Sequence, residues 1–246
     1  MGQAIGNALA KTKGLKIFAY DKNRNKVKAA AGVSFARLDA LEKSDVIIVA
    51  VKPQDVLALA GQLLGKIGPQ TILISIAAGL PIKKLARLFR HKKIVRMMPN
   101  LGLAVGQGIA AWKSAGLSPR DKKAAKYVLN SITENFEVKN ESLIDAVTAI
   151  SGSGPAYFFF FAGALMSSAK SLGLDSAQSR RLVEKTLSAA AELQKGADYG
   201  ELIKKVRSKK GTTDAALKVF QKRSADKIIA QAVKAAFVRA KELSNG

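Results

Sequence analysis

Short, unbroken apolar runs alternate with helix-like segments over the first half of the chain. Five runs predict strands, at residues 15–20, 45–51, 71–76, 94–98 and 108–112. Such runs are typical of strands covered on both faces. Residues 4–12, 22–31 and 56–64 predict helices, and Pro81 is expected in the first turn of another. This alternation predicts an α/β fold with a doubly wound parallel sheet.

The strand pattern stops near residue 140, and long helical segments rich in Ala and Leu follow. They cover residues 156–172, 176–196, 199–206, 212–223 and 225–243. Asp175 and Ser224 are expected as N-caps of two of these helices. We therefore predict two domains, 1–140 with the sheet and 141–246 all-helical. So small a helical domain has more apolar helix surface than it can bury alone, which favours a second subunit.

One stretch, residues 146–169, carries no charge and is long enough to span a bilayer. Its Ser-Gly-Ser-Gly-Pro segment at 151–155 would break a spanning helix. We expect a buried core helix, with the four phenylalanines at 158–161 in its core. No secretory signal is visible at the N-terminus. The chain is expected to be cytoplasmic, without a membrane partner.

The amino-acid composition limits the kinds of functional site that the chain can form. The chain has no Cys and a single His, His91, which argues against zinc clusters and thiol nucleophiles. His91 is expected to be exposed and without a role. With 41 Lys+Arg against 18 Asp+Glu, the formal net charge is +23. This excess favours anionic ligands, and nucleic acid is the alternative. Because aromatic residues make up only 6% of the chain, we expect no nucleic-acid partner.

The first turn of a doubly wound sheet commonly carries G-x-G-x-x-G, which holds a pyrophosphate at a helix N-terminus. This chain opens on Met1-Gly2. If Gly2 is the last glycine of that fingerprint, the strand and the two glycines before it are absent. The sheet is therefore expected to lack its first strand.

Five further motifs occur in a characteristic order. They are Ala50-Val51-Lys52-Pro53, Ala77-Ala78-Gly79, Met98-Pro99-Asn100, the segment 150–157 at the domain junction, and Ser208-Lys209-Lys210-Gly211-Thr212-Thr213. Together they resemble the pyrroline-5-carboxylate reductases over essentially the whole chain. The junction segment combined with the late Gly-Thr-Thr is the most specific part of the resemblance.

The resemblance implies a dinucleotide-binding, Rossmann-like domain at 1–140 and a helical substrate and dimerisation domain at 141–246. It implies hydride transfer from a nicotinamide cofactor to the C=N bond of 1-pyrroline-5-carboxylate, which gives L-proline. The implied assembly is a homodimer or a higher homo-oligomer. NADPH is the expected cofactor and NADH the alternative. Asp21 favours NAD, whereas Lys22, Asn23, Arg24 and Lys26 would suit a 2′-phosphate or form a solvated helix face.

The resemblance also assigns residues, and none of them is a metal ligand. The implied cofactor-binding residues are Met1, Gly2, Ala50, Val51, Lys52, Pro53, Ala77, Ala78, Gly79 and Asn100. The implied substrate-binding residues are Ser208, Gly211, Thr212 and Thr213. Thr213 is the expected catalytic residue, because its hydroxyl could bond the ring nitrogen as that nitrogen becomes an amine.

Two of the departures from the family pattern bear most directly on the expected activity. The first strand is missing, and Lys209 and Lys210 stand where the substrate loop usually has Pro and Gly. An alternative function is therefore a divergent protein of the same fold that lacks this activity and binds an anionic ligand, a partner or nucleic acid.

Overall fold

The computed structural model describes residues 1–23 and 32–245. These form two compact units, one of Met1–Ser153 with Ala236–Gly246 and one of Gly154–Ala235. Each unit is described by itself. The domain boundary at residue 140 stays a prediction. The helix expected at 22–31 falls mostly outside the described residues.

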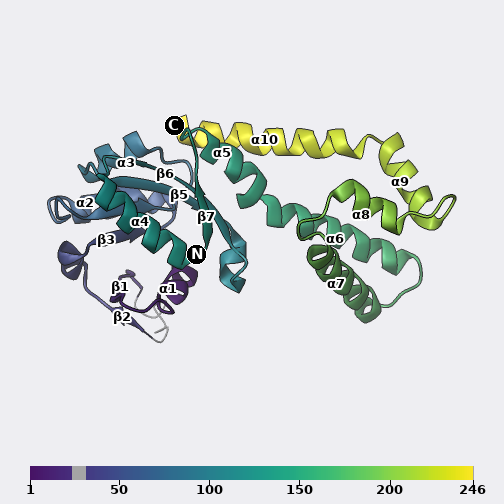
Figure 1. Ribbon diagram of the computed structural model, residues 1–246, viewed down its shortest axis with the longest axis horizontal. Helices are drawn as coiled ribbons and strands as arrows, with labels where there is room; N and C mark the ends of the chain where they lie inside the picture. Colours follow the sequence, from purple (N-terminus) through teal and green to yellow (C-terminus); the bar gives the residue numbers. More distant parts are fainter. Residues whose placement is uncertain (24–31, 246) are drawn as a thin grey trace. The chain divides into compact units, whose positions relative to one another are not determined.

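The first unit contains the sheet, and its elements alternate as the apolar pattern predicted (Figure 1). They are α1 (Gly2–Leu9), β1 (Ile17–Ala19), β2 (Val33–Phe35), η2 (Leu38–Lys43), β3 (Val46–Val49), η3 (Pro53–Asp55), α2 (Val56–Leu63), β4 (Ile72–Ser75), α3 (Ile82–Phe89), β5 (Ile94–Pro99), η4 (Leu101–Val105), β6 (Ile109–Ala115), α4 (Pro119–Ile132), β7 (Glu134–Glu137), α5 (Leu143–Val147) and η5 (Thr148–Gly152). Pro81 is the N-cap of α3, one residue before the position expected for it.

The main sheet has the strand order β3-β4-β5-β6-β7. Neighbouring strands pair in parallel, except that β5 and β6 run antiparallel. The sequence predicted a wholly parallel sheet, and this prediction is wrong for the pair of β5 and β6. Only residues 100–108 connect β5 to β6, which is too short for the crossover that a parallel neighbour requires.

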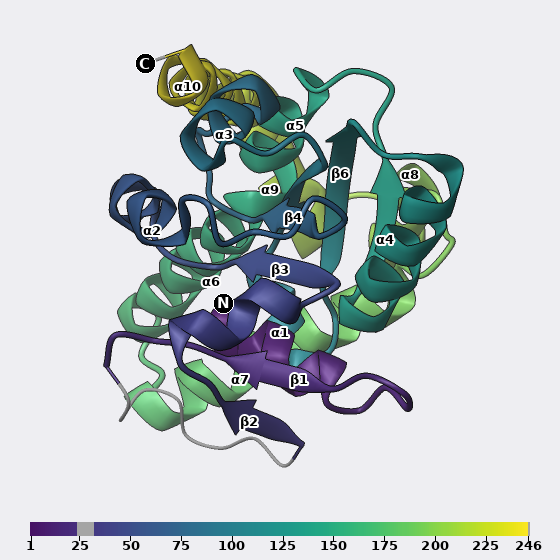
Figure 2. The ribbon, with the colours of Figure 1, turned by 90° about the vertical axis from the view of Figure 1, so that its left-hand side faces the viewer.

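Helices cover both faces of the sheet, because successive strand residues point to opposite sides. Ile72 and Ile74 of β4 join a core with α1 and α4, whereas Leu73 joins a second core with α2 and α3. Figure 2 shows α3 above the strands and α2 to their left, with α1 below the strands and α4 to their right. The doubly wound architecture is thus confirmed.

Among the described residues, β1 pairs in parallel with β2 in a separate two-stranded sheet. The outer edge of β3 has no partner strand in the described part of the chain, and neither has the second edge of β1. The expectation that the sheet lacks a strand next to α1 stays a prediction.

His91 is buried, which corrects the expectation that it is exposed and without a role. It is 8% exposed, and its Nε2–H donates to the carbonyl oxygen of Thr71 at 2.7 Å. The preceding residue, Arg90, ends α3 in the left-handed conformation and turns the chain inward. His91 therefore ties the end of α3 to the beginning of β4.

The second unit is all-helical, as the sequence predicted. It holds α6 (Gly154–Ser171), α7 (Ser176–Leu193), α8 (Tyr199–Val206), α9 (Thr212–Lys222) and the first half of α10 (Ala225–Asn245). Asp175 is confirmed as an N-cap and forms a reciprocal capping box with Gln178. Ser224 has a φ of 51°, which is not the extended conformation of an ordinary N-cap.

The phenylalanines of α6 are not in the core of this chain, contrary to expectation. Residues 158–161 are 50–82% exposed. The apolar stretch Leu143–Ser171 has the length and composition of a membrane span, and only 11% of its apolar window is buried within the chain. An apolar surface of this kind marks an interaction site.

We expect Asp121 to make the stability of the first unit depend on acid pH. Its carboxylate bonds Lys93 Nζ at 2.9 Å and the Ser118 hydroxyl at 2.8 Å. These contacts lower the pKa of Asp121 from 3.8 to about 2. A lowered folded-state pKa adds stability above the unfolded pKa, and that stability is lost as pH falls towards 2. Unfolding titrations should show wild type losing its advantage over Asp121→Asn between about pH 4 and 2, and a constant difference would contradict this.

Candidate functional site

The expected cofactor residues gather at one edge of the main sheet. In the parallel register, Val49 of β3 pairs with Ser75 of β4, and Ser75 pairs with Arg96 of β5. The segments 50–53 and 77–79 and the residue Asn100 therefore follow their strands at the same carboxyl edge. This edge is where open α/β sheets bind their ligands.

Gly2 brings the start of α1 to this edge. A Cβ atom built on Gly2 would lie 3.3 Å from the Cβ of Ala50, which follows β3. Met1 is the N-cap of α1 and makes no side-chain cap bond. The first-turn amides of α1 are thus free of a side-chain cap beside Ala50, and such amides suit an anionic group.

The loop after β4 is built around two constrained residues. Ala77 is buried, and its N–H donates to the Ser75 hydroxyl at 3.3 Å. Gly79 has a φ of 71°, a conformation that a side chain disfavours. Ala78 and Gly79 are partly exposed. These two residues therefore constrain the backbone of the loop at this edge.

The segment after β3 presents exposed side chains. Val51, Lys52 and Pro53 are exposed, and Lys52 is the N-cap of η3. Asp55 at the end of η3 lies 3.6 Å from Lys22 Nζ, an exposed pair that contributes little to stability. Asp21 accepts a bond from the Asn23 amide at 2.8 Å. Arg24 and Lys26 lie outside the described residues.

Asn100 closes the turn that carries the chain from β5 to β6. Its Oδ1 accepts from the amide of Ile109 at 3.2 Å, and its carbonyl accepts from Leu103 at 3.3 Å. The amide oxygen of the side chain is therefore occupied by the fold. Its NH₂ group is the part that could contact a cofactor.

The expected substrate residues lie in the second unit, where α9 begins. Gly211 is the N-cap of α9 and makes no side-chain cap bond. Its N–H donates to the carbonyl of Ser208 at 3.0 Å, and a Cβ on Gly211 would collide with the Ser208 hydroxyl. Thr213 is half-buried in the first turn. The structure thus brings Ser208, Gly211, Thr212 and Thr213 together.

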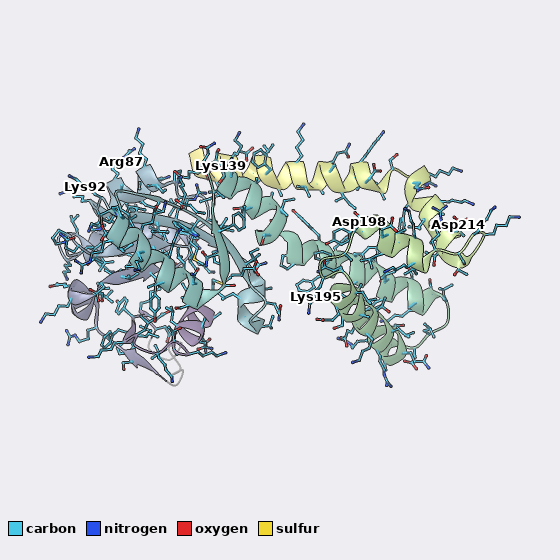
Figure 3. All side chains as sticks on the ribbon, viewed as in Figure 1. Arg87, Lys92, Lys139, Lys195, Asp198 and Asp214 are labelled. Atoms are coloured by element: carbon cyan, nitrogen blue, oxygen red, sulfur yellow. The ribbon has the colours of Figure 1, made fainter. Side chains whose placement is uncertain are left out.

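An ion cluster that the sequence reasoning missed surrounds Asp214, which Figure 3 labels at the start of α9. Asp214 is 5% exposed and bonds Lys218 Nζ at 2.9 Å and Arg207 Nε at 2.7 Å. These two cations, Lys218 foremost, lower the pKa of Asp214. The only signal in the sequence was the i,i+4 spacing of Asp214 and Lys218. Because Asp214 is neutralised, the first turn of α9 stays attractive to an anion.

Lys210 occupies a position that favours glycine. Its φ is 60°, in the left-handed region. Lys209 and Lys210 are both exposed. The departure from the family pattern at 209–210 is therefore accommodated by backbone strain at one residue, and it adds two cations beside α9.

A groove of about 1360 Å³ lies along α1 in the first unit. It is lined by α1, η4 and the residues that join α4 to β7, with Gln3, Asn7 and Lys11 among its polar members. None of the ten expected cofactor residues lines it. We place the candidate site at the carboxyl edge of the sheet rather than in this groove.

The fold and this edge are typical of a nucleotide-binding α/β protein, and the comparisons with known proteins identify the class as an oxidoreductase. The profile "NADP oxidoreductase coenzyme F420-dependent" matches residues 1–79, and "Pyrroline-5-carboxylate reductase dimerisation" matches residues 141–243. Curated pyrroline-5-carboxylate reductases from Pseudomonas aeruginosa and Aquifex aeolicus are 35% and 34% identical to this chain. The first match covers 87% of this chain and 80% of the relative, and the second 99% and 94%.

Solved structures agree with this result. A pyrroline carboxylate reductase from Plasmodium falciparum with NADP bound matches with a TM-score of 0.84 and 29% identity. A pyrroline-5-carboxylate reductase from Coxiella burnetii matches with a TM-score of 0.86 and 27% identity. Each match covers 99% of this chain and 94% of the other. This chain belongs to the pyrroline-5-carboxylate reductase family.

We expect Asn100→Asp to separate the two uses of this side chain. The aspartate keeps an oxygen for Ile109, so the free energy of unfolding should change by less than about 1 kcal/mol. It loses the NH₂ donor and adds a negative charge, so the dissociation constant of NADPH should rise about tenfold, or about 1.4 kcal/mol. Chemical unfolding and fluorescence titration measure the two effects. An unchanged affinity for NADPH would leave Asn100 as a turn residue alone.

Proposed function

We propose that this chain reduces 1-pyrroline-5-carboxylate to L-proline with NADPH. The observation that carries the proposal is the presence of two candidate sites, one in each unit, in a chain of this family. One is a sheet edge with a free helix N-terminus at Gly2, and the other is the start of α9 with Thr213. The supporting relatives carry this activity in their names over most of the chain length.

The residues at the sheet edge fit a dinucleotide. The uncapped first turn of α1 suits a phosphate group, and Gly2 lets α1 begin close beside Ala50. Residues 77–79 supply close backbone on the neighbouring strand end, where the nicotinamide half would lie. When bound, the reduced nicotinamide supplies the hydride. The protein's part is to hold that donor at one side of the substrate and to exclude other geometries.

The start of α9 fits the substrate. Its uncapped amides and the macrodipole attract a carboxylate. Thr213 would donate a hydrogen bond to the ring nitrogen, which becomes an amine as the adjacent carbon accepts the hydride. The proton on that nitrogen can come from solvent before transfer, so the site needs no strong acid–base pair. Orientation is then the main contribution of the protein.

Lys209 and Lys210 extend this anion site. Two exposed cations beside a helix N-terminus disfavour the helix by a few tenths of a kcal/mol. A bound carboxylate offsets that cost. We therefore assign the two lysines to the rim of the substrate site, where they attract the anionic substrate without touching the reacting atoms.

A homodimer accounts for the exposed apolar helices. The dimerisation profile covers residues 141–243, and the exposed phenylalanines of α6 lie inside that range. Burial by a second copy removes the apolar area of α6 from water without a membrane. A biosynthetic reductase of this kind is expected in the cytoplasm.

The alternative is a protein of this fold that binds anions or nucleic acid without reducing the imine. The positive net charge and the two lysines of the substrate loop favour it. Proline formation by the purified chain excludes it. Strong, salt-dependent DNA binding in the absence of any reductase activity would support it.

We expect Thr213→Ala to lower kcat more than it weakens NADPH binding. A bond that strengthens as the nitrogen becomes an amine acts on the transition state. Its loss should cost about 2 kcal/mol, or roughly 30-fold in kcat. Steady-state kinetics would measure kcat, and Thr213→Ser, which keeps a hydroxyl, should recover most of it. Equal kcat values in wild type and Thr213→Ala would remove Thr213 from the mechanism.

A further inference from the structure

The last turn of α10 is held inside the first unit by a buried polar cluster. Ser244 is 9% exposed, and its hydroxyl donates to Asp145 Oδ1 at 3.0 Å. The same hydroxyl lies 3.2 Å from the guanidinium NH2 of Arg96 and accepts its bond. One side chain at the end of the chain thus bridges α5 and β5.

Arg96 extends the cluster to the cofactor edge. Its NH2 bonds Asp145 Oδ1 at 2.9 Å, and its NH1 bonds Glu141 Oε1 at 3.0 Å. The same oxygen of Glu141 accepts from the amide of Ile82 at 2.8 Å. Ile82 is the first residue of α3, so a continuous chain of bonds joins Ser244 to the residue that follows the loop 77–81.

The same turn of α10 also abuts that loop directly. A Cβ on Gly79 would lie 2.8 Å from the Cβ of Leu243 and 3.0 Å from its carbonyl oxygen. Real Cβ atoms do not approach other atoms this closely, so only glycine fits at this position. The loop is therefore fixed from two directions, through its own backbone at Gly79 and through the N-terminus of α3 at Ile82.

We propose that the last turn of α10 positions the loop 77–81, with Ser244 as the positioning residue that acts through Arg96 and Glu141. The proposal rests on the proposed function, which places the nicotinamide half of the cofactor at this loop. A hydride donor displaced by about 1 Å can lose about 100-fold in rate. A loop held by backbone contact and a buried ionic cluster keeps that displacement small.

The chemistry of the cluster suits a positioning role. Arg96 and Asp145 are both buried, so each must keep its partners, and the guanidinium offers bonds in fixed directions. Loss of the Ser244 hydroxyl leaves Arg96 and Asp145 paired with each other, but it removes their hydrogen bonds to α10. The fold should survive this change while the loop loses one of its two supports.

The test compares three full-length variants. Ser244→Ala removes the link, Ser244→Thr keeps a hydroxyl, and Glu242→Gln is the matched control on the same turn. Glu242 pairs only with Arg239 at the surface among the described contacts. Each variant is assayed for kcat with pyrroline-5-carboxylate, for the dissociation constant of NADPH by fluorescence, and for the midpoint of thermal unfolding.

We expect Ser244→Ala to lower kcat about tenfold and to weaken NADPH binding about threefold, as loss of a bond to charged groups allows. Ser244→Thr should recover at least half of each effect, and Glu242→Gln should match wild type. A lower unfolding midpoint with kcat and NADPH affinity unchanged would reduce the cluster to a structural anchor and overturn the proposal.

Two further outcomes are distinguishable. If Ser244→Ala does not fold, Glu141→Gln tests the same path, because it weakens the bond to Arg96 but keeps an oxygen for Ile82. An NADPH affinity equal to wild type in that variant overturns the proposal.

If wild type binds NADPH but forms no proline, the proposed function fails. The effect of Ser244→Ala on NADPH affinity then still decides the role of the last turn of α10.

Discussion

The guanidinium of Arg96 is a charge inside the central sheet, and the surrounding structure satisfies it. A buried charge that loses its partners destabilises a fold by several kcal/mol. Here the partners come from two distant parts of the sequence: Glu141 and Asp145, before and within α5, and Ser244 at the end of α10. One strand residue thus fixes where the chain enters the helical region and where it returns. The same cluster bonds the first amide of α3, beside the edge at which the cofactor is expected.

Much of the fold could be predicted because buried strands carry their own signal. The apolar runs around Val49, Ile74 and Val95 predicted β3, β4 and β5. By contrast, β2 and β7 were missed because they are short and alternate polar with apolar residues, as in Glu134–Glu137. The antiparallel β6 was misassigned in direction, although the short connection after Asn100 contained the information. Local patterns identify strands, whereas their direction depends on chain length between them.

The site was only partly predictable, for a related reason. Residues near Gly2, Ala50 and Gly79 could be selected by resemblance, and the parallel register explains why they share one edge. Nothing local predicted that Leu243 would abut Gly79, or that His91 would be buried against Thr71, because both are contacts between distant segments. The exposed phenylalanines of α6 show most clearly what a local sequence pattern cannot predict. A helix pattern predicts that apolar residues are buried, but it does not say in which subunit.

Hydride transfer from NADPH to the imine carbon of pyrroline-5-carboxylate leaves a mark on the product that can be measured. The most direct measurement uses NADPH deuterated at the transferring C4 position and follows the product by mass spectrometry and NMR. We expect proline that carries one deuterium on C5, the ring carbon beside nitrogen that does not bear the carboxylate. We also expect NADPH to be consumed in equal amount. Unlabelled proline, or no proline from a chain that binds NADPH, would rule out this hydride transfer.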